Sequence, residues 1–502
     1  METFGRTVLV ADRPREYTAA SVGRILDAVM ETHLQNAAEL EYLWDFYRGD
    51  QDILERVKEV RPEITHNTVE NRAWEIVNFK LGYEFSHPVL YTNAKSGDEV
   101  TGPDVAYENP YISVLNKFAR VDKKERKDVK LAEWMYVGGT SYRMCMPIRH
   151  MTEDTAPYFT ASMDPRTTFV VYANEPDGPV LFAGSTVERT ERGPDGKDVV
   201  YVITGVYTET AFFEWKIAVD DMKAAAYEDA PTSRQDVNGL GMIPIIEYPL
   251  NEARLGYVEL VRDLLNAINN LTSNCIEDIE QTVQSFLILI NADLPKDDDG
   301  NPKIPKKNSV LSIGNGTSNS DAKFISNRLG HDQTHFTKAD LLQALYEIAG
   351  VPDRQSRNQG GGDTGQAVVL RNGWGASEAR AKTTEKVFKA SEFELLKIIL
   401  RICRDTTSVD IGDLTLHDID VKFTRNRNDN MLVKAQTMQM LLHSGANPED
   451  VYEVVELWSD APATWQRSKS WQEQNADRVP RNTVIGTWPG PLVPETEPPP
   501  AG

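Results

Sequence analysis

One apolar stripe between residues 251 and 284 constrains the fold more than any other feature of the sequence. Apolar side chains recur there at helical spacing across about 27 residues, at Val258, Val261, Leu264, Leu265, Ile268, Leu271, Ile276 and Ile279. At about 1.5 Å per residue, a continuous helix of this length measures about 40 Å. A compact domain seldom needs so long a helix. The sequence therefore predicts one unusually long helix.

A second helix is predicted at residues 332–349. It ends at Gly350, because Pro352 follows closely and cannot continue a helix. Between the two helices lies a turn-rich segment with three short runs typical of strands, at residues 285–290, 310–313 and 324–325. The pattern indicates two helices joined by a small segment that contains strands.

The remainder of the chain combines strands with helices. Residues 141–219 contain short β-branched and aromatic runs separated by Gly, Pro and Asp, which is typical of an antiparallel sheet. Gly373 and Gly375 flank Trp374 within a helical pattern, so a kink is expected there. We predict an α+β fold of two to four domains. Helical periodicity marks residues 18–47, 67–81, 367–404 and 429–458.

Composition excludes several classes of protein. The 502 residues carry 54 Lys and Arg against 76 Asp and Glu, and the net charge of −22 disfavours a tight, sequence-reading DNA-binding protein. The longest apolar run, residues 286–290, is too short to cross a bilayer, and the charged first residues do not suit a secretory signal. We therefore expect a soluble, cytoplasmic protein. Its three cysteines have no paired spacing, which indicates a reducing compartment: Cys145, Cys275 and Cys403.

Three short motifs are similar to catalytic or metal sites, and each lacks a residue that the chemistry needs. The glycines of residues 360–365 are not followed by the Lys and Ser or Thr of a phosphate loop. His331 and His335 are spaced as in zinc peptidases, but Asp332 stands where a Glu activates water. The acidic turn at residues 297–301 lacks the Gly and Glu of a calcium loop. A cytosolic metal- or nucleotide-dependent hydrolase is therefore an alternative with weak support.

Cationic and amide side chains gather at three places in this acidic chain. Residues 120–130 hold six Lys or Arg and three acids, which favours a salt-bridged helix face. Lys303, Lys306 and Lys307 form either a docking surface or a solubilising turn. A Gly-rich loop after Pro352 has donors that suit a sugar–phosphate backbone and no aromatic residue for base stacking. These donors are Arg354, Gln355, Arg357, Asn358 and Gln359.

A series of short motifs occurs in a specific order and spacing, although each is weak alone. They are residues 47–54, 67–89, 136–142, 163–165, 243–247, 349–353 and 363–367. Together they resemble the landmarks of portal proteins of tailed double-stranded-DNA bacteriophages, specifically the long-tailed siphophage type. The resemblance covers roughly residues 43–458.

The resemblance implies a portal-type fold with a mixed wing, a helical stem, a small α/β clip, a tunnel loop and a helical crown. The wing would comprise residues 1–250 together with a spanning helix and return strand in 367–429. The remaining parts would be the stem helices 251–284 and 332–350, the clip 285–331, the tunnel loop 351–366, the crown 430–479 and a flexible, Pro-rich tail 480–502.

The resemblance also implies a structural protein without catalytic residues, cofactor or metal. About twelve copies would form a ring at one capsid vertex, through which double-stranded DNA is packaged and ejected without sequence specificity. The expected partners are the large terminase subunit, the head–tail connector or adaptor proteins, and the major capsid and scaffolding proteins, with no membrane. The chain would occur in the virion, and in the host cytoplasm during assembly. A competing hypothesis is a soluble channel module of another secretion machine, which would also form a ring.

Particular residues receive roles from the same resemblance. The donors of the tunnel loop, Arg354 to Gln359, would touch passing DNA, and the acidic balance of the chain suits a conduit in which DNA must slide. Gly373, Trp374 and Gly375 would kink the spanning helix. The clip would present a cluster of lysines to the packaging motor or connector: Lys296, Lys303, Lys306 and Lys307.

Overall fold

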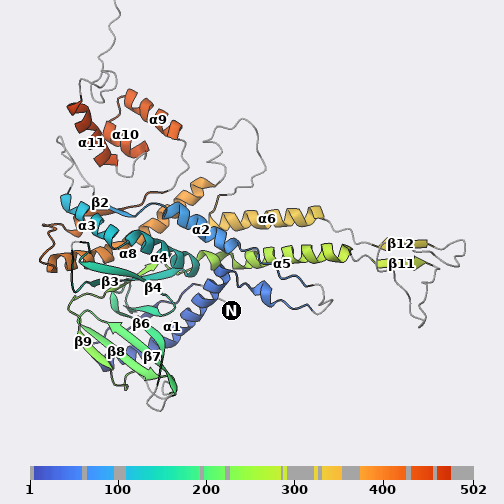
Figure 1. Cartoon of the computed structure of the whole chain (residues 1–502), viewed down its shortest axis with the longest axis horizontal. Coiled ribbons are helices and arrows are strands. Elements are labelled where there is room, and N and C mark those ends of the chain that lie inside the picture. Colours follow the sequence, from blue (N-terminus) through green and yellow to red (C-terminus); the bar gives the residue numbers. More distant parts are fainter. Residues whose placement is uncertain are drawn as a thin grey trace, which may run out of the picture.

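The computed structural model describes residues 5–58, 65–94, 109–152, 154–192, 197–220, 227–283, 286–290, 321–325, 331–352, 373–425, 431–455 and 461–475. Helices and strands are mixed in these residues, which confirms the predicted α+β class. Figure 1 shows a body of sheets and helices, from which one pair of helices extends.

The larger sheet in the described residues has six strands, in the order β1-β5-β6-β7-β8-β9. β1 pairs parallel with β5, and the other neighbours are antiparallel. β1 escaped prediction because three residues are too few to show an alternating pattern. The strands are β1 (Leu9–Ala11), β5 (Thr168–Ala173), β6 (Val180–Arg192), β7 (Asp198–Tyr207), β8 (Ala211–Ala218) and β9 (Arg234–Val237).

A second sheet has the order β10-β3-β4 and comprises β3 (Thr140–Pro147), β4 (Tyr158–Met163) and β10 (Ile245–Pro249). The expectation of one sheet across residues 141–219 is therefore wrong. Between β4 and β5, Thr167 donates its backbone N–H to the Asp164 carbonyl at 3.1 Å. This turn separates the strands into two sheets. A further two-stranded sheet pairs β2 (Leu90–Asn93) with β13 (Ile419–Lys422).

Helix α1 (Ala19–Arg48) connects two hydrophobic cores. Thr18 and Ser21 form a capping box at its start, and it ends at Gly49, whose φ of 113° is left-handed. Its first half packs against the larger sheet, through Val22, Ile25, Leu26, Val29 and Met30. Its last turns, with Leu43, Phe46 and Tyr47, belong to the second core. The helix predicted at residues 18–47 is confirmed.

The second core lies among the helices of the body (Figure 1). These are α2 (Arg72–Glu84), α3 (Pro110–Val121), α4 (Lys124–Gly138), α8 (Trp374–Asp405) and the beginning of α5 (Tyr257–Val283). The chain crosses itself closely where α5 begins. A Cβ at Gly139 would lie 1.9 Å from the Arg254 carbonyl oxygen, and its φ of 83° is left-handed, so glycine is required there.

α5 and α6 (His331–Ala349) lie side by side and extend from the body, with β11 (Phe286–Ile290) and β12 (Asp321–Ile325) beyond them (Figure 1). Both long helices are confirmed. α5 starts later than residue 251 because the Asn251 side chain bonds the backbone N–H and carbonyl of Leu255 and forms a turn. β11 and β12 pair antiparallel. The strand predicted at residues 310–313 lies outside the described residues.

In the described residues after β13, three helices follow: α9 (Met431–His443), α10 (Pro448–Val455) and α11 (Ala461–Gln474). α10 packs against both neighbours, and the rings of Tyr452 and Trp465 lie 5.5 Å apart. The helical structure predicted for residues 429–458 is confirmed by α9 and α10, which lie on either side of Gly445, and α11 is a further helix. The predicted tail, residues 480–502, lies outside the described residues. Two short 3-10 helices complete the description: η1 (Asp52–Glu55) and η2 (Leu416–Asp418).

Candidate functional site: the helix pair and its attachment to the body

One face of α5 carries polar side chains that bind residues within 51–58 and 65–70. Asn266 donates to the Asp52 carboxylate at 2.7 Å, and Asn269 donates to the Gln51 side chain at 2.6 Å. Asn269 and Ser273 also accept backbone N–H groups of Glu70 and Thr68 at 2.8 and 3.0 Å. We call Asn266, Asn269, Ser273 and Glu277 the polar ladder. Their spacing of three or four residues places them on one helix face.

Glu277 anchors the ladder farthest from the body. Its side chain is almost fully buried and accepts the backbone N–H of His66 at 3.0 Å. Lys58 pairs with the same carboxylate, and Arg56 lies 3.6 Å from it. A buried carboxylate with two cations and a backbone donor is well satisfied. The ladder thus holds the segment before α2 along most of α5.

The end of α6 is held by side chains from two other helices. Lys80 of α2 and Ser377 of α8 both donate to the Gly350 carbonyl, at 3.2 and 2.7 Å. Arg380 binds the carbonyls of Glu347 and Ile348. Cations at these carbonyls complement the negative end of the helix dipole. The position where α6 ends is therefore fixed by the body.

Lys80 lies where α5 begins and α6 ends. Its ammonium is 4.8 Å from the ring centroid of Tyr257, the first residue of α5. Burial lowers the pKa of Lys80 to about 8, and the nearby Glu84 opposes this shift. One buried amine therefore contacts the inner ends of both extended helices.

The predicted kink residues lie at the start of α8. Gly373, with a left-handed φ of 81°, is its N-cap, and Trp374 is its first residue. The Trp374 ring lies 5.9 Å from that of Phe79 and 5.8 Å from that of Tyr83, so it packs against α2. A Cβ at Gly375 would meet no atom of the described residues within 4 Å, beyond its own helix and chain neighbours. Residues 367–372 lie outside the described residues, so the kink stays a prediction.

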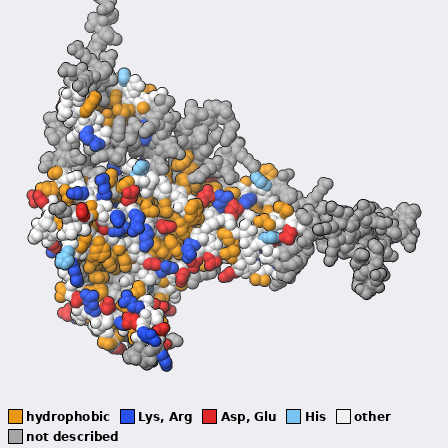
Figure 2. Space-filling view, in the orientation of Figure 1, with side chains coloured by type: hydrophobic (Ala, Val, Ile, Leu, Met, Phe, Trp, Pro, Cys, Tyr) orange, Lys and Arg blue, Asp and Glu red, His pale blue; other side chains and the backbone are white. Residues whose placement is uncertain are grey.

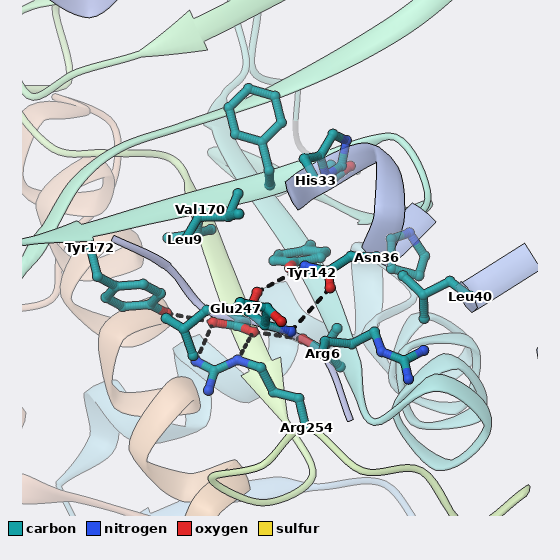
Figure 3. A pocket seen from close by; sticks show the side chains of 16 residues that line it. Arg6, Leu9, His33, Asn36, Leu40, Tyr142, Val170, Tyr172, Glu247 and Arg254 are labelled. Carbon is teal, nitrogen blue, oxygen red and sulfur yellow. Dashed lines mark hydrogen bonds and ion pairs between the residues drawn. The ribbon is translucent and has the colours of Figure 1, made fainter. Parts of the chain in front are cut away.

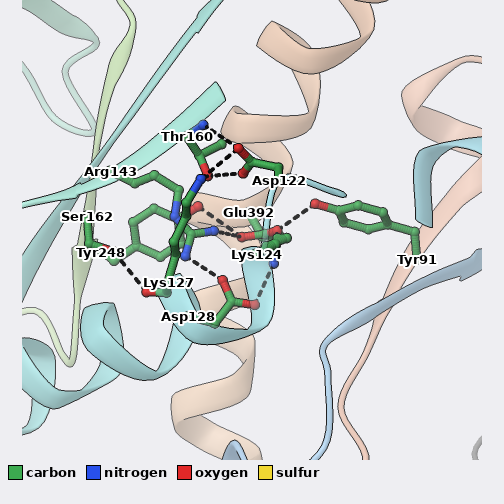
Figure 4. A network of polar contacts seen from close by, with 10 residues as sticks. All are labelled: Tyr91, Asp122, Lys124, Lys127, Asp128, Arg143, Thr160, Ser162, Tyr248 and Glu392. Carbon is green, nitrogen blue, oxygen red and sulfur yellow. Dashed lines mark hydrogen bonds and ion pairs between the residues drawn. The ribbon is translucent and has the colours of Figure 1, made fainter. Parts of the chain in front are cut away.

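A buried ionic network connects α8 with α4 and with β3 of the three-stranded sheet (Figure 4). Lys124 binds Asp128 and Glu392 at 2.8 Å each, and Arg143 binds Asp128 and lies 3.6 Å from Glu392. Burial alone would raise the pKa of Glu392, but Lys124 and Arg143 lower it below its ordinary value. Tyr91 and Tyr248 donate to the same carboxylate at 2.8 and 2.9 Å.

This network refines the prediction for residues 120–130. Part of the run is salt-bridged, as expected, but Lys124 and Asp128 are buried. Lys127 binds Asp122 at 2.6 Å, and Asp122 also accepts the Thr160 backbone N–H at 3.1 Å. Some charged residues of this run therefore bind α4 to neighbouring elements, whereas the sequence predicts only a salt-bridged face for the helix.

A small pocket lies between the N-terminal segment, α1 and both sheets (Figure 3). In it, Glu247 accepts two hydrogen bonds from Arg254 at 2.8 and 3.0 Å, and one each from Tyr172 and Thr140 at 2.6 and 2.8 Å. Burial would raise the pKa of Glu247, but Arg254 holds it below its ordinary value. The carboxylate is therefore engaged by structural partners.

The N-terminal segment also contacts the base of α5. The backbone N–H of Gly5 and the Arg6 guanidinium bind the two oxygens of Glu259 at 2.8 and 2.9 Å. Asn36 of α1 bonds the backbone of Thr7 in both directions, at 3.0 and 2.8 Å. One segment thus links α1, α5 and, through β1, the larger sheet.

Most of the residues singled out by sequence lie outside the described part of the chain. These are the tunnel-loop donors Arg354, Gln355, Arg357, Asn358 and Gln359, and the clip lysines Lys296, Lys303, Lys306 and Lys307. The structure describes their flanks, namely Gly350 to Pro352 and Gly373 for the loop, and β11 and β12 for the clip. Their proposed contacts stay predictions.

The sequence analysis did not predict the polar ladder. It also did not predict the clamp on α6, by which we mean the side chains that hold the end of this helix: Lys80, Ser377 and Arg380. The signal for the ladder was present, because Asn, Ser and Glu recur at helical spacing beside the apolar stripe. The clamp had no local signal, since Lys80, Ser377 and Arg380 are distant from Gly350 in sequence.

Of the motifs of the alternative hydrolase, only the histidine pair lies within the described residues, and residues 297–301 and 360–365 lie outside them. His331 is the first residue of α6 and His335 lies one turn later. Among the described residues, no group of three or more His, Cys, Asp or Glu side chains could hold a metal ion. In the same part of the chain, no helix is long and apolar enough to span a membrane.

The described residues thus form an α+β body with an extended helix pair, which the polar ladder joins to residues 51–58 and 65–70. A family model described as "Phage portal protein, SPP1 Gp6-like" matches residues 26–478. The chain belongs to this family, whose members are structural proteins of the bacteriophage capsid vertex that serve DNA packaging. No curated protein matches the chain.

Proposed function

We propose that about twelve copies of this chain form a ring whose central channel passes DNA during packaging and ejection. The observation that carries this proposal is the helix pair α5–α6, which extends from the body of a phage portal protein. Its base is fixed at both helix ends by Glu259 and Lys80. A long wall with a rigid base suits a channel that must bear moving DNA.

The parts of the subunit follow from this proposal. α5 and α6 would form the stem, and β11 with β12 would belong to the clip, where the large terminase and later the connector proteins dock. Residues 351–366 would form the tunnel loop. α9, α10 and α11 would form the crown. The siphophage type of the parent phage, the major capsid and scaffolding proteins as partners, and a cytoplasmic stage during assembly belong to the same proposal.

Ring formation is the direct test. Purified full-length protein is examined by negative-stain electron microscopy and mass photometry, alone and with the scaffolding protein of the phage. We expect closed rings with a central hole wide enough for duplex DNA. A chain that stays monomeric at micromolar concentration under both conditions would contradict the proposal.

The roles of the loop and clip residues need a packaging readout. In an in vitro packaging reaction, Arg354→Gln with Arg357→Gln should alter DNA retention or translocation. Charge reversal of Lys303, Lys306 and Lys307 should weaken motor docking. Rings of either variant that package DNA like the wild type would remove that role.

A further inference from the structure

α3 and α4 present a stripe of five exposed cations, which we call the basic stripe: Lys117, Arg120, Lys123, Arg126 and Lys130. They follow one another at intervals of three or four residues, so they share one face of each helix and meet at the corner between them. Lys123, with a left-handed φ of 57°, forms that corner.

These five cations differ from the other two Lys of the same run. Lys124 and Lys127 point to carboxylates, with ion pairs of 2.8 and 2.6 Å. None of the five stripe residues forms an ion pair with any residue that the structure describes. Lys130 only helps to lower the pKa of Asp164. Two of the six cations in residues 120–130 are thus paired internally, and the other four, together with Lys117, are left for an external anion, with Glu125 as the exposed acid between them.

The surroundings of the stripe favour a polyphosphate over a protein partner. Protein interfaces usually need buried aromatic or apolar anchors, and among the large apolar side chains of α3 and α4 only Val121 is exposed, at 37%. Phosphate contacts need only Lys and Arg in a row. Five exposed cations without an ion-pair partner among the described residues thus lie on two short helices, in a chain of net charge −22.

The position of the stripe agrees with this chemistry. Figure 1 places α3 at the end of the molecule opposite to β11 and β12. In Figure 2, Lys and Arg side chains gather on that part of the body, in the region where Figure 1 labels α3, α4 and α8. If β11 and β12 face the motor outside the capsid, as the proposed function requires, α3 faces the interior that holds packaged DNA.

We propose that the basic stripe binds duplex DNA on the outer surface of the body, through phosphates and without reading sequence. The contact is separate from the channel. It would let the subunit hold neighbouring DNA turns while the channel wall stays weakly attractive.

The test uses relaxed circular duplex DNA, which cannot thread a closed ring and so reports binding to the outside. Filter binding of full-length protein is measured over a range of KCl concentrations. Lys117→Gln, Arg120→Gln and Arg126→Gln are combined in one variant. We expect weaker binding and a slope of log K against log[KCl] that is shallower by about 3, one for each lost phosphate contact.

A matched control removes the same charge from exposed cations of the larger-sheet region that already pair with carboxylates. Arg24, Lys216 and Arg234 pair with Glu228, Glu191 and Asp236. Changing all three to Gln should leave the slope as in the wild type. The proposal is overturned if the stripe variant keeps the wild-type slope, or if the control loses as much.

Mass photometry on the same samples separates this proposal from the proposed function. Rings in all three proteins with a reduced slope only in the stripe variant support both. Wild-type protein without rings contradicts the proposed function, yet the slope comparison among the three proteins still decides whether the stripe binds DNA.

Discussion

His33 is a buried titratable side chain that has no ion-pair partner among the described residues. It lies in the middle of α1, is 3% exposed and packs against Phe169, with ring centroids 5.1 Å apart (Figure 3). Its Nε2 atom has no hydrogen-bond partner among the described residues. Burial therefore lowers the pKa of His33 from 6.5 to about 4. The imidazole is neutral at pH 7 in the folded chain.

This burial predicts a specific loss of stability in acid. Between pH 6.5 and about 4, the unfolded chain binds a proton at His33 that the folded chain does not, so stability falls as the pH falls through this range. Relative to His33→Leu, the wild type should lose about 3 kcal/mol of unfolding free energy between pH 7 and 4. Denaturant unfolding at both pH values measures it.

Phe169→Leu is the matched control, because it changes the packing around His33 without removing a titratable group. It should cost similar stability at both pH values. If His33→Leu tracks the wild type across the whole range, the imidazole is protonated in the folded chain and the prediction is wrong.

At the scale of elements, α5 shows what sequence periodicity can and cannot reveal. The apolar stripe predicted the helix, because burial selects apolar residues at the helical period. The polar ladder on its other side was not predicted, although it bonds to residues 51–52 and 65–70 and so determines where these residues lie. α2 accordingly begins at Arg72, five residues later than expected, since the preceding residues bond to α5 instead of to their own helix.

Neighbouring asparagines of α5 test the ladder. Asn269 is fully buried and bonds Gln51 and the Glu70 backbone, so Asn269→Ala should cost about 1–3 kcal/mol because it leaves buried polar groups unpaired. Hydrogen exchange should also increase in residues 65–71. Thermal or denaturant unfolding with exchange mass spectrometry measures both effects.

Asn270→Ala supplies the comparison, because the exposed Asn270 amide bonds only the Asn266 carbonyl within α5. This change should be nearly neutral, since Ala favours a helix. Equal effects of the two substitutions would show that the ladder contributes nothing specific.

Features that depend on residues close together in the sequence could be predicted, and contacts between residues far apart in the sequence could not. Long helices and most strands follow from local periodicity, and short motifs in order indicated the portal family. The pairing of Lys124 with Glu392, and of Lys80 with Gly350, joins residues far apart in the chain, so no local pattern could indicate them. The division into two sheets was missed because strand composition does not specify the partner strand.

At the scale of the whole molecule, α1 holds two cores together. Its first half belongs to the core under the larger sheet, and its last turns belong to the core among α2, α4, α5 and α8. The larger sheet also contacts the second sheet through the cluster of Val170, Ala183 and Ile245, but α1 is the helix that contributes side chains to both large cores. The middle of α1 is therefore the position where one change should affect their coupling.

Gln35→Pro places a helix breaker at an exposed position between the two cores. It should cost about 3 kcal/mol through the lost backbone bond and the ring clash. The loss should be uneven: exchange should increase more in β5 to β8, whose core is smaller, than in α4 and the base of α5. Hydrogen exchange mass spectrometry measures the difference.

Gln35→Ala keeps the helix and is the control, with exchange expected as in the wild type. A uniform increase across both cores after Gln35→Pro would contradict the idea that α1 joins two separable units.

In mechanical terms, α1 is a strut. Its 30 residues form a rod about 45 Å long, which starts under the larger sheet and ends beside α2, α4 and α5. A rod transmits a push without the slack that a loop would introduce. A force that tilts the larger sheet would therefore displace the base of the helix pair. A force on the helix pair would in turn displace the larger sheet through the same helix.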